Sequence, residues 1–282
     1  MLYHFFTKTI GLLAKLYCKV WFSGYERIPK KKPAIMASNH LAVIDSIILP
    51  ITVWRKIWFI GKKEYFQTDT LKHRFIKWIF ESVSVHPVDR SGGKASEGGL
   101  NVGRKALDSG HLFGIYPEGT RSPDGFLYKG HTGVAKLALE KQVPVVTVAM
   151  IATREAQPPH CKKPKSMRCG IIFGGPLEFS NFYSEYDKAT KEENRQVIHD
   201  ILRKVTDEIM MDLHSHSGQV YIDMYAQEAK EVIASAKEDN PNISETELNL
   251  VVLNYAKTKG YKVLDSVIPE NIKFAKKQGP QL

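Results

Sequence analysis

Short apolar runs alternate with longer segments of helical spacing between residues 34 and 150. Apolar runs of about four to eight residues are typical of buried strands, and apolar positions three and four apart are typical of helices. Their alternation predicts an α/β fold with a mixed, mostly parallel sheet flanked by helices. The predicted strands lie near Ala34–Ala37, Ile57–Ile60, Val83–His86, Leu112–Tyr116, Val145–Met150 and Arg168–Phe173.

Helical spacing connects these strands and continues after the last of them. The turn residues Asn240-Pro241-Asn242 separate the final two predicted helices. We therefore expect a main α/β domain over residues 28–217 and a helical C-terminal extension over residues 218–282. The predicted helices are Ile44–Val53, Leu71–Glu81, Lys94–Asp108, Thr132–Lys141, Lys188–His214, Val220–Lys237 and Ser244–Thr258.

The N-terminal segment, residues 1–27, is rich in apolar and aromatic residues but is interrupted by Lys8, Lys15 and Lys19. These lysines fit neither a signal peptide nor a membrane-spanning helix. On a helical projection they fall on one polar stripe, which predicts an amphipathic helix lying in a membrane interface. An amphipathic helix packed on the protein core would show the same pattern.

The charge is concentrated in the main domain. The chain carries a formal +10, and from Gly218 onward 8 basic residues face 9 acidic ones, so the extension is near −1 and the body near +11. A basic body suits nucleic acid, an anionic membrane surface or phosphate-bearing substrates. Three cysteines without C-x-x-C spacing argue against a disulfide framework and a zinc site, and favour a reducing compartment.

Candidate chemistry begins just after the first predicted strand. His40 is followed five residues later by Asp45, at the start of a predicted helix. A carboxylate bonded to one imidazole nitrogen leaves the other nitrogen able to take a proton from a hydroxyl nucleophile. Two structural alternatives remain open at this point: Asp45 as a helix cap and His40 as a core histidine.

Polar residues also follow two later strands. Glu118, Gly119 and Arg121 come after the strand Leu112–Tyr116, and Arg90 comes after Val83–His86. A carboxylate, a glycine and an arginine fork could hold a phosphate-bearing alcohol, although a solvated turn has the same composition. Open α/β sheets bind ligands at the carboxyl ends of their strands, so these residues are candidates for one site.

Four blocks in this order resemble the glycerolipid acyltransferase family, whose bacterial members acylate 1-acylglycerol-3-phosphate. The resemblance is strong over about residues 28–150 and weak elsewhere. Two positions depart from the family pattern: His86 replaces a more usual apolar residue, and Thr147 a usual proline. The blocks are Asn39-His40 to Asp45, Pro87-Val88-Asp89-Arg90, Pro117 to Ser122, and Val143 to Ala149.

The resemblance implies that His40 is the general base and Asp45 its orienting partner. Glu118, Thr120, Arg121 and Arg90 would lie in the acceptor site, together with Lys62, although Lys63 is an alternative. Gly119 would supply an oxyanion-binding N–H.

The reaction implied is transfer of a fatty acyl group to the sn-2 hydroxyl of 1-acylglycerol-3-phosphate, giving phosphatidic acid. Acyl-CoA or acyl carrier protein would be the donor, and no metal or other cofactor would be needed. We expect a peripheral or monotopic protein at the cytoplasmic face of a membrane.

Three alternatives remain. The same chemistry could serve another lysophospholipid or a glycolipid acceptor, because sequence does not settle headgroup choice. A basic protein without catalytic activity that binds nucleic acid would not need the His40–Asp45 spacing, and we expect no nucleic-acid partner. A metal-dependent hydrolase is disfavoured because the histidines show no ligand-like clustering beyond His214-x-His216.

Overall fold

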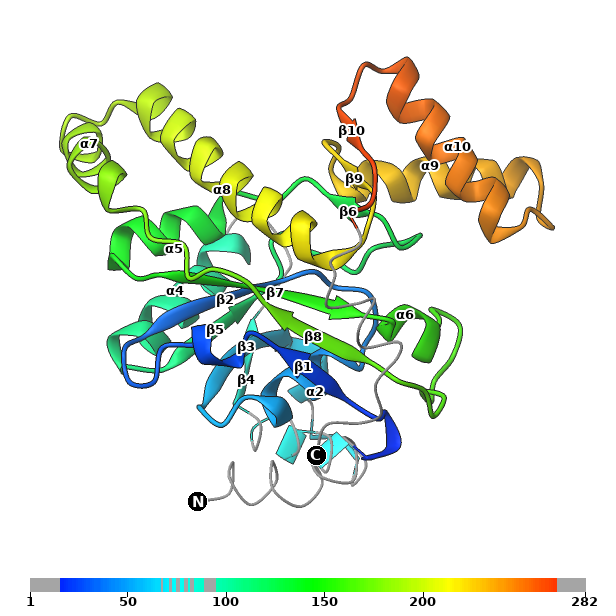
Figure 1. Ribbon diagram of the computed structural model, residues 1–282, viewed down its shortest axis with the longest axis horizontal. Helices are drawn as coiled ribbons and strands as arrows, with labels where there is room; N and C mark the ends of the chain where they lie inside the picture. Colours follow the sequence, from blue (N-terminus) through cyan, green and yellow to red (C-terminus); the bar gives the residue numbers. More distant parts are fainter. Residues whose placement is uncertain are drawn as a thin grey trace.

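A seven-stranded, mostly parallel sheet forms the centre of the molecule (Figure 1). The computed structural model describes residues 16–66, 68–70, 73–74, 77–78, 81, 84–88 and 95–267. Five strands are parallel, and β8 pairs antiparallel with β7 and parallel with β1. The order is β1 (Trp21–Ser23), β8 (Gly170–Phe173), β7 (Val145–Ile151), β2 (Ala34–Ser38), β5 (Leu112–Ile115), β3 (Ile57–Lys62) and β4 (Val85–Val88).

Helices cover both faces of this sheet. All five residues of β2 are buried, because alternate side chains enter two different cores. Ala34 and Met36 pack with α2 (Asp45–Thr52) on one face. Ile35 and Ala37 pack on the other with α4 (Ala95–Asp108), α5 (Gly133–Lys141), α7 (Ser180–Lys191) and α8 (Arg195–Ser217).

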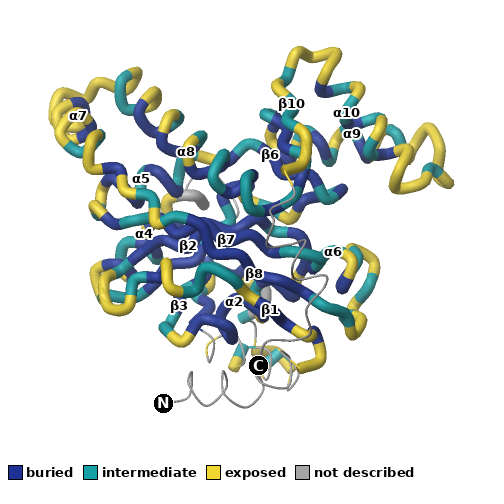
Figure 2. Tube along the Cα trace, in the orientation of Figure 1, coloured by how far each residue is buried: buried dark blue, intermediate teal, exposed yellow. Residues whose placement is uncertain are grey.

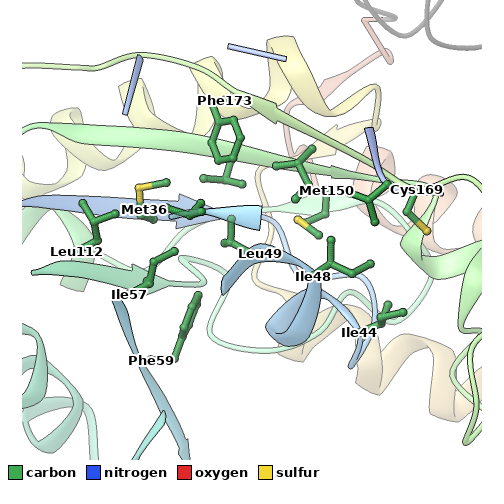
Figure 3. Close-up of a cluster of buried hydrophobic side chains, with 14 of the residues drawn as sticks. Met36, Ile44, Ile48, Leu49, Ile57, Phe59, Leu112, Met150, Cys169 and Phe173 are labelled. Carbon is green, nitrogen blue, oxygen red and sulfur yellow. The ribbon is translucent and has the colours of Figure 1, made fainter. Parts of the chain in front are cut away.

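The core beneath α2 fixes the helix that carries Asp45. Figure 3 shows Ile48 and Leu49 of α2 pointing toward the strands that carry Met36 and Met150, and all four side chains are fully buried. Burying one such side chain stabilises the fold by about 1.5–3 kcal/mol. These buried contacts therefore fix the position of the first turn of α2 relative to the end of β2.

A second, three-stranded sheet joins the C-terminal extension to the main domain. Its order is β10 (Val263–Leu264), β9 (Tyr221–Ile222) and β6 (Leu127–Tyr128). Helices α9 (Ala226–Asp239) and α10 (Glu245–Thr258) pack against it, and Figure 2 shows exposed positions toward their far ends. Phe126 and Tyr128 of the main domain belong to this core, so the extension and the domain share buried residues.

The predicted fold class is confirmed, and several boundaries need correction. The six predicted strands are present, but β1 lies within the segment expected to be one helix, because Trp21 packs on Gly170 of β8. The main domain therefore begins before residue 28. The extension is not purely helical, since Tyr221 and Ile222 are buried in β9 and α9 begins only at Ala226.

Other predicted elements change in length or lie outside the described residues. The helix expected over 188–214 is two helices, because Glu193 takes a positive φ of 52° and the Asn194 side chain caps α8. Residues 1–15 of the predicted interfacial helix, and most of the predicted helix 71–81, lie outside the described residues. Among the described residues, no helix combines the length and the apolar character that crossing a membrane requires.

The two departures from the family pattern have local explanations. The ring of His86 stacks on Trp58, with centroids 4.0 Å apart. The Thr147 hydroxyl donates a hydrogen bond to Asp212 of α8. The His86 ring therefore packs β4 against β3, and the Thr147 hydroxyl links β7 to α8.

Candidate active site

His40 and Asp45 are in direct contact where β2 turns into α2. The Asp45 Oδ2 atom lies 3.0 Å from His40 Nδ1. The same oxygen accepts backbone N–H bonds from Leu41 at 2.7 Å and Ala42 at 2.8 Å. Asp45 is fully buried, and these donors stabilise its charge in place of water. The turn therefore holds the carboxylate in one position, facing one nitrogen of the imidazole.

This contact determines which nitrogen of His40 is available. A carboxylate at Nδ1 favours the tautomer that carries its proton there, so Nε2 keeps its lone pair. Nε2 has no hydrogen-bond partner among the described residues, and the side chain is 15% exposed. A nitrogen that is basic, oriented and accessible is what a general base requires.

Tyr116 holds the plane of the imidazole ring. The two rings stack with centroids 3.8 Å apart and planes 11° from parallel. The Tyr116 hydroxyl is 2.9 Å from Ser46 Oγ on α2, and burial raises the pKa of this phenol. The stack and the Asp45 bond constrain the ring in two directions. Tyr116 had no role assigned from sequence, because its partner lies 76 residues earlier.

The loop 117–122 is bonded directly to the backbone of His40. Ser122 N–H donates to the His40 carbonyl at 2.8 Å, and Glu118 Oε1 accepts from His40 N–H at 3.4 Å. Glu118 Oε2 accepts a further bond from Tyr128 N–H at 3.0 Å. Two blocks that are far apart in the chain thus form one structural unit, and the parallel pairing of β2 with β5 brings them to the same edge of the sheet.

Glu118 lies beneath the site rather than on its surface. It is only 2% exposed, and burial raises the pKa of Glu118 to about 8 despite the N–H donors of Tyr128 and His40. Both oxygens face backbone N–H groups. This position does not fit the expected direct contact with the acceptor, and Glu118 instead ties the loop to His40.

The raised pKa of Glu118 predicts a pH dependence of stability. Between its ordinary value of 4.5 and about 8, the folded state holds a proton that the unfolded state has lost. Glu118 therefore lowers the free energy of unfolding as pH rises through this window, by at most about 1.4 kcal/mol per pH unit.

Urea unfolding at about pH 5.5 and about pH 7.5 checks this expectation. Glu118→Gln should lose less stability between the two pH values than the wild type, whereas the exposed control Glu192→Gln should match the wild type. Equal losses in the wild type and Glu118→Gln would show that Glu118 does not titrate in this range.

The N–H of Gly119, which the resemblance implies as the oxyanion donor, is bonded within the loop in this structure. Gly119 adopts a positive φ of 73°, and its N–H donates to the Tyr116 carbonyl at 2.9 Å. This hydrogen bond closes the turn, and the oxyanion role of Gly119 stays a prediction. The N–H groups of Thr120 and Arg121 have no acceptor among the described residues.

Thr120 and Arg121 face different surroundings. The Thr120 hydroxyl accepts a hydrogen bond from Lys230 of α9. Arg121 is exposed and has no ion pair or hydrogen bond among the described residues. An unpaired guanidinium near His40 can bind an anionic group of a substrate.

Asn39 and Gln219 connect the site to the extension. Asn39 is buried, accepts from Met150 N–H at 2.7 Å and donates to Gln219 Oε1 at 2.6 Å. Gln219 in turn donates to the Gly125 carbonyl at 2.7 Å. Sequence reasoning did not identify Gln219, because nothing local marks a glutamine whose partners lie 94 and 180 residues away.

Two predicted residues can be located only in part. Lys62 is the last residue of β3, and its register partner Val88 ends β4. Both positions lie at the same edge of the sheet as the end of β2, because these strands are parallel. The Lys62 side chain and the whole of Arg90 lie outside the described residues, so their roles stay predictions.

Among the residues described, no three His, Cys, Asp or Glu side chains are arranged as a metal site.

A family model matches the part of the chain that contains His40, Asp45 and the loop 117–122. Residues 19–151 match the family model described as Acyltransferase. This match covers 133 of the 282 residues, just under half of the chain.

Several relatives share sequence with the chain. It is 27% identical over 186 residues to a 1-acyl-sn-glycerol-3-phosphate acyltransferase of Bacillus subtilis, covering 64% of this chain and 85% of that protein. A Borreliella burgdorferi enzyme of that name is 27% identical, with 48% and 52% covered. For a chloroplastic enzyme of Arabidopsis thaliana, identity is 26%, with 55% and 43% covered. The chain thus spans about half the length of the latter two relatives.

A solved structure has the same fold. The crystal structure of the 1-acyl-sn-glycerophosphate (LPA) acyltransferase, PlsC, from Thermotoga maritima superimposes with a TM-score of 0.50 at 23% identity. The match covers 73% of this chain and 78% of that one.

The Acyltransferase match ends at residue 151, so it includes His40, Asp45 and the loop 117–122 but not the extension.

Proposed function

We propose that the protein transfers a fatty acyl group from acyl-CoA or acyl carrier protein to the sn-2 hydroxyl of 1-acylglycerol-3-phosphate, forming phosphatidic acid. The observation that carries the proposal is the His40–Asp45 pair, with Nε2 open beside a loop that carries an unpaired arginine. The names of the relatives from Bacillus subtilis and Borreliella burgdorferi support the choice of acceptor.

In the proposed mechanism the acceptor hydroxyl attacks the thioester directly. His40 Nε2 takes the hydroxyl proton as the oxygen bonds to the carbonyl carbon, and Asp45 stabilises the imidazolium that forms. The N–H groups of Thr120 and Arg121, which have no acceptor among the described residues, bind the oxyanion in this mechanism. The C–S bond then breaks, and the leaving thiolate takes the proton from His40. A thioester is already activated, so this sequence needs no metal or redox cofactor.

A competition between acceptors tests the proposal. Purified protein would receive radiolabelled acyl-CoA, or acyl carrier protein charged with the same chain, and a mixture of lysolipids differing only in headgroup. Phosphatidic acid should dominate the products, because an unpaired Arg121 favours a phosphate monoester. Preferential acylation of lysophosphatidylcholine or a lysoglycolipid would keep the chemistry and reject the acceptor.

We further propose that α2 faces a bilayer. Val43, Ile47 and Trp54 are 49%, 49% and 74% exposed, at a spacing that places them along one side of α2 and its end. Phe22 is also exposed, and its ring is 5.5 Å from that of Tyr25, whose hydroxyl accepts from Trp54 N–H. Exposed apolar side chains beside the catalytic turn would let a lipid acceptor reach His40 from the membrane.

The cysteines carry no disulfide, which suits the cytoplasmic face.

Replacing two of these side chains should weaken membrane binding. Ile47→Ser with Trp54→Ser removes apolar area that the bilayer would bury, so partitioning onto vesicles of phosphatidylglycerol and phosphatidylethanolamine should fall about tenfold or more. Vesicle sedimentation measures it. Leu250→Ser, at an equally exposed position on α10, is the matched control. Unchanged sedimentation of the double variant would rule out this face as the docking surface.

A further inference from the structure

Three consecutive lysines, Lys30, Lys31 and Lys32, form an exposed loop just before β2, which we call the lysine loop. Among the described residues, none of the three side chains has an ion pair or a hydrogen bond. Like charges on neighbouring residues repel one another, and an anionic surface against them relieves that repulsion.

The acidic residues around the lysine loop have basic partners or neighbours of their own. Glu26 is exposed and is followed directly by the exposed Arg27. Asp108, which comes before the segment that the loop contacts, is ion-paired with Lys141 at 2.7 Å. The lysine loop therefore keeps its positive charge among the described residues.

The backbone of the lysine loop is held in place by Arg55. The Arg55 guanidinium donates hydrogen bonds to the carbonyls of Pro29 at 2.6 Å, Lys31 at 3.3 Å and Lys32 at 2.7 Å. It also donates to the Gly110 carbonyl at 2.8 Å, just before β5. A planar guanidinium bonded to four carbonyls leaves the loop little freedom. The three lysines therefore extend from a fixed backbone.

The same arrangement joins the lysine loop to the apolar side of α2. Trp54 directly precedes Arg55 and is highly exposed, and its N–H donates to the Tyr25 hydroxyl at 2.9 Å. Tryptophan side chains favour the headgroup level of a bilayer, and lysines beside them attract anionic headgroups. A basic loop at the border of an exposed apolar face is complementary to an anionic membrane surface.

The lysine loop lies away from the candidate catalytic residues. Strand β2 begins at Ala34, directly after the loop and Pro33, and His40 follows the end of that strand. The loop and His40 are therefore at opposite edges of the sheet. A role of the lysines in docking can thus be separated from a role in acyl transfer.

We propose that the lysine loop binds anionic phospholipid headgroups of the bilayer that α2 faces. This inference rests on the proposed function and deepens it, because it names the class of lipid that the docking surface selects. Trp54 and the apolar side of α2 enter the interface, and the three lysines contact the phosphates around it. Binding then depends on the anionic lipid content and on the ionic strength.

The test measures sedimentation with vesicles of phosphatidylglycerol and phosphatidylcholine, and with vesicles of phosphatidylcholine alone. It compares the full-length wild type with the triple variant Lys30→Gln, Lys31→Gln, Lys32→Gln. One lysine near an anionic surface contributes about fivefold in binding, so the triple variant should bind the mixed vesicles about 100-fold more weakly. Both proteins should bind phosphatidylcholine alike, because the apolar side of α2 is unchanged. Added salt should weaken the wild type toward the level of the variant.

Two further variants calibrate this comparison. Replacing all three lysines of the loop by arginine keeps the charge and should keep the binding. The matched control is Lys257→Gln with Lys259→Gln and Lys262→Gln, which removes the same charge from exposed positions of the extension and should bind within about twofold of the wild type. Circular dichroism and thermal melting check that each variant is folded.

Three outcomes would overturn the proposal. The glutamine variant could bind the mixed vesicles as the wild type does, could lose equally on phosphatidylcholine alone, or could lose no more than the extension variant. A raised KM for acyl carrier protein in detergent micelles, with vesicle binding unchanged, would also overturn it and would assign the lysines to an acidic protein donor.

Vesicle binding is measured without turnover, so its result is separate from that of the acyl-transfer assay. In detergent micelles the glutamine variant should form product at the wild-type rate, because no bilayer has to be bound. No product from the wild type in micelles would reject the proposed acyl transfer, whereas the vesicle measurement alone decides the role of the lysine loop.

Discussion

Replacing His40 by alanine should lower kcat about 10²- to 10⁴-fold, the usual contribution of a general base. The protein should stay folded, because Asp45 Oδ2 keeps its bonds from Leu41 and Ala42 N–H after the imidazole is removed. Initial rates at saturating donor and acceptor, together with a urea unfolding curve, measure the two effects separately.

An exposed histidine provides the control for this experiment. His199 lies on α8 with its side chain 67% exposed, so His199→Ala should retain full turnover. If His40→Ala turned over at the wild-type rate while folded, the general-base role would be rejected. A large loss of stability would instead indicate that the His40–Tyr116 stack mainly supports the fold.

Removing the C-terminal extension, residues 218–282, should unfold the protein or abolish its activity. The truncation would expose Phe126, Leu127 and Tyr128, which pack against the extension and are 9%, 0% and 0% exposed. Their exposure would cost about 5 kcal/mol or more, comparable to the whole stability of many domains. Denaturant unfolding and activity of the truncated chain measure this effect.

Point variants separate packing from simple loss of chain. Ile222→Ala leaves a cavity in the fully buried strand β9 and should cost about 2–5 kcal/mol. Leu250→Ala, at an exposed position of α10, should change stability by less than about 0.5 kcal/mol. A stable and active truncated protein would show that the extension is an independent appendage.

The sequence was sufficient to predict features that depend on local patterns. Strands such as β2 and β7 are continuous apolar runs because both of their faces are covered, and such runs are visible without knowing the partner strand. His40 and Asp45 are only five residues apart, so one strand-to-helix turn brings them together. The pair could therefore be identified from spacing and family resemblance.

Features that depend on distant partners were missed. Strand β1 has three residues, and its pairing partner Gly170 lies 149 positions after Trp21. The two-residue strands β6 and β9 are too short for a period to show. Lys230 reaches Thr120 across 110 residues, and nothing in its own neighbourhood distinguishes it from other lysines on α9.

Hydrogen-bond direction is also invisible in a motif. The block from Pro117 to Ser122 suggested that Gly119 would offer its N–H and Glu118 its carboxylate to a ligand. In the structure the Gly119 N–H closes the turn onto Tyr116, and Glu118 is buried against backbone donors. Backbone groups at such a turn must be paired or reach solvent, and only the fold shows which of the two applies.

The most direct test of the central claim is acyl transfer from radiolabelled acyl-CoA to 1-acylglycerol-3-phosphate by the purified wild type and His40→Ala, with the product identified by mass. We predict phosphatidic acid from the wild type and only a trace from the variant. Phosphatidic acid formed equally by both proteins would contradict the role of His40. Its absence from both, with acyl-CoA and with acyl carrier protein as donor, would contradict the proposed acceptor.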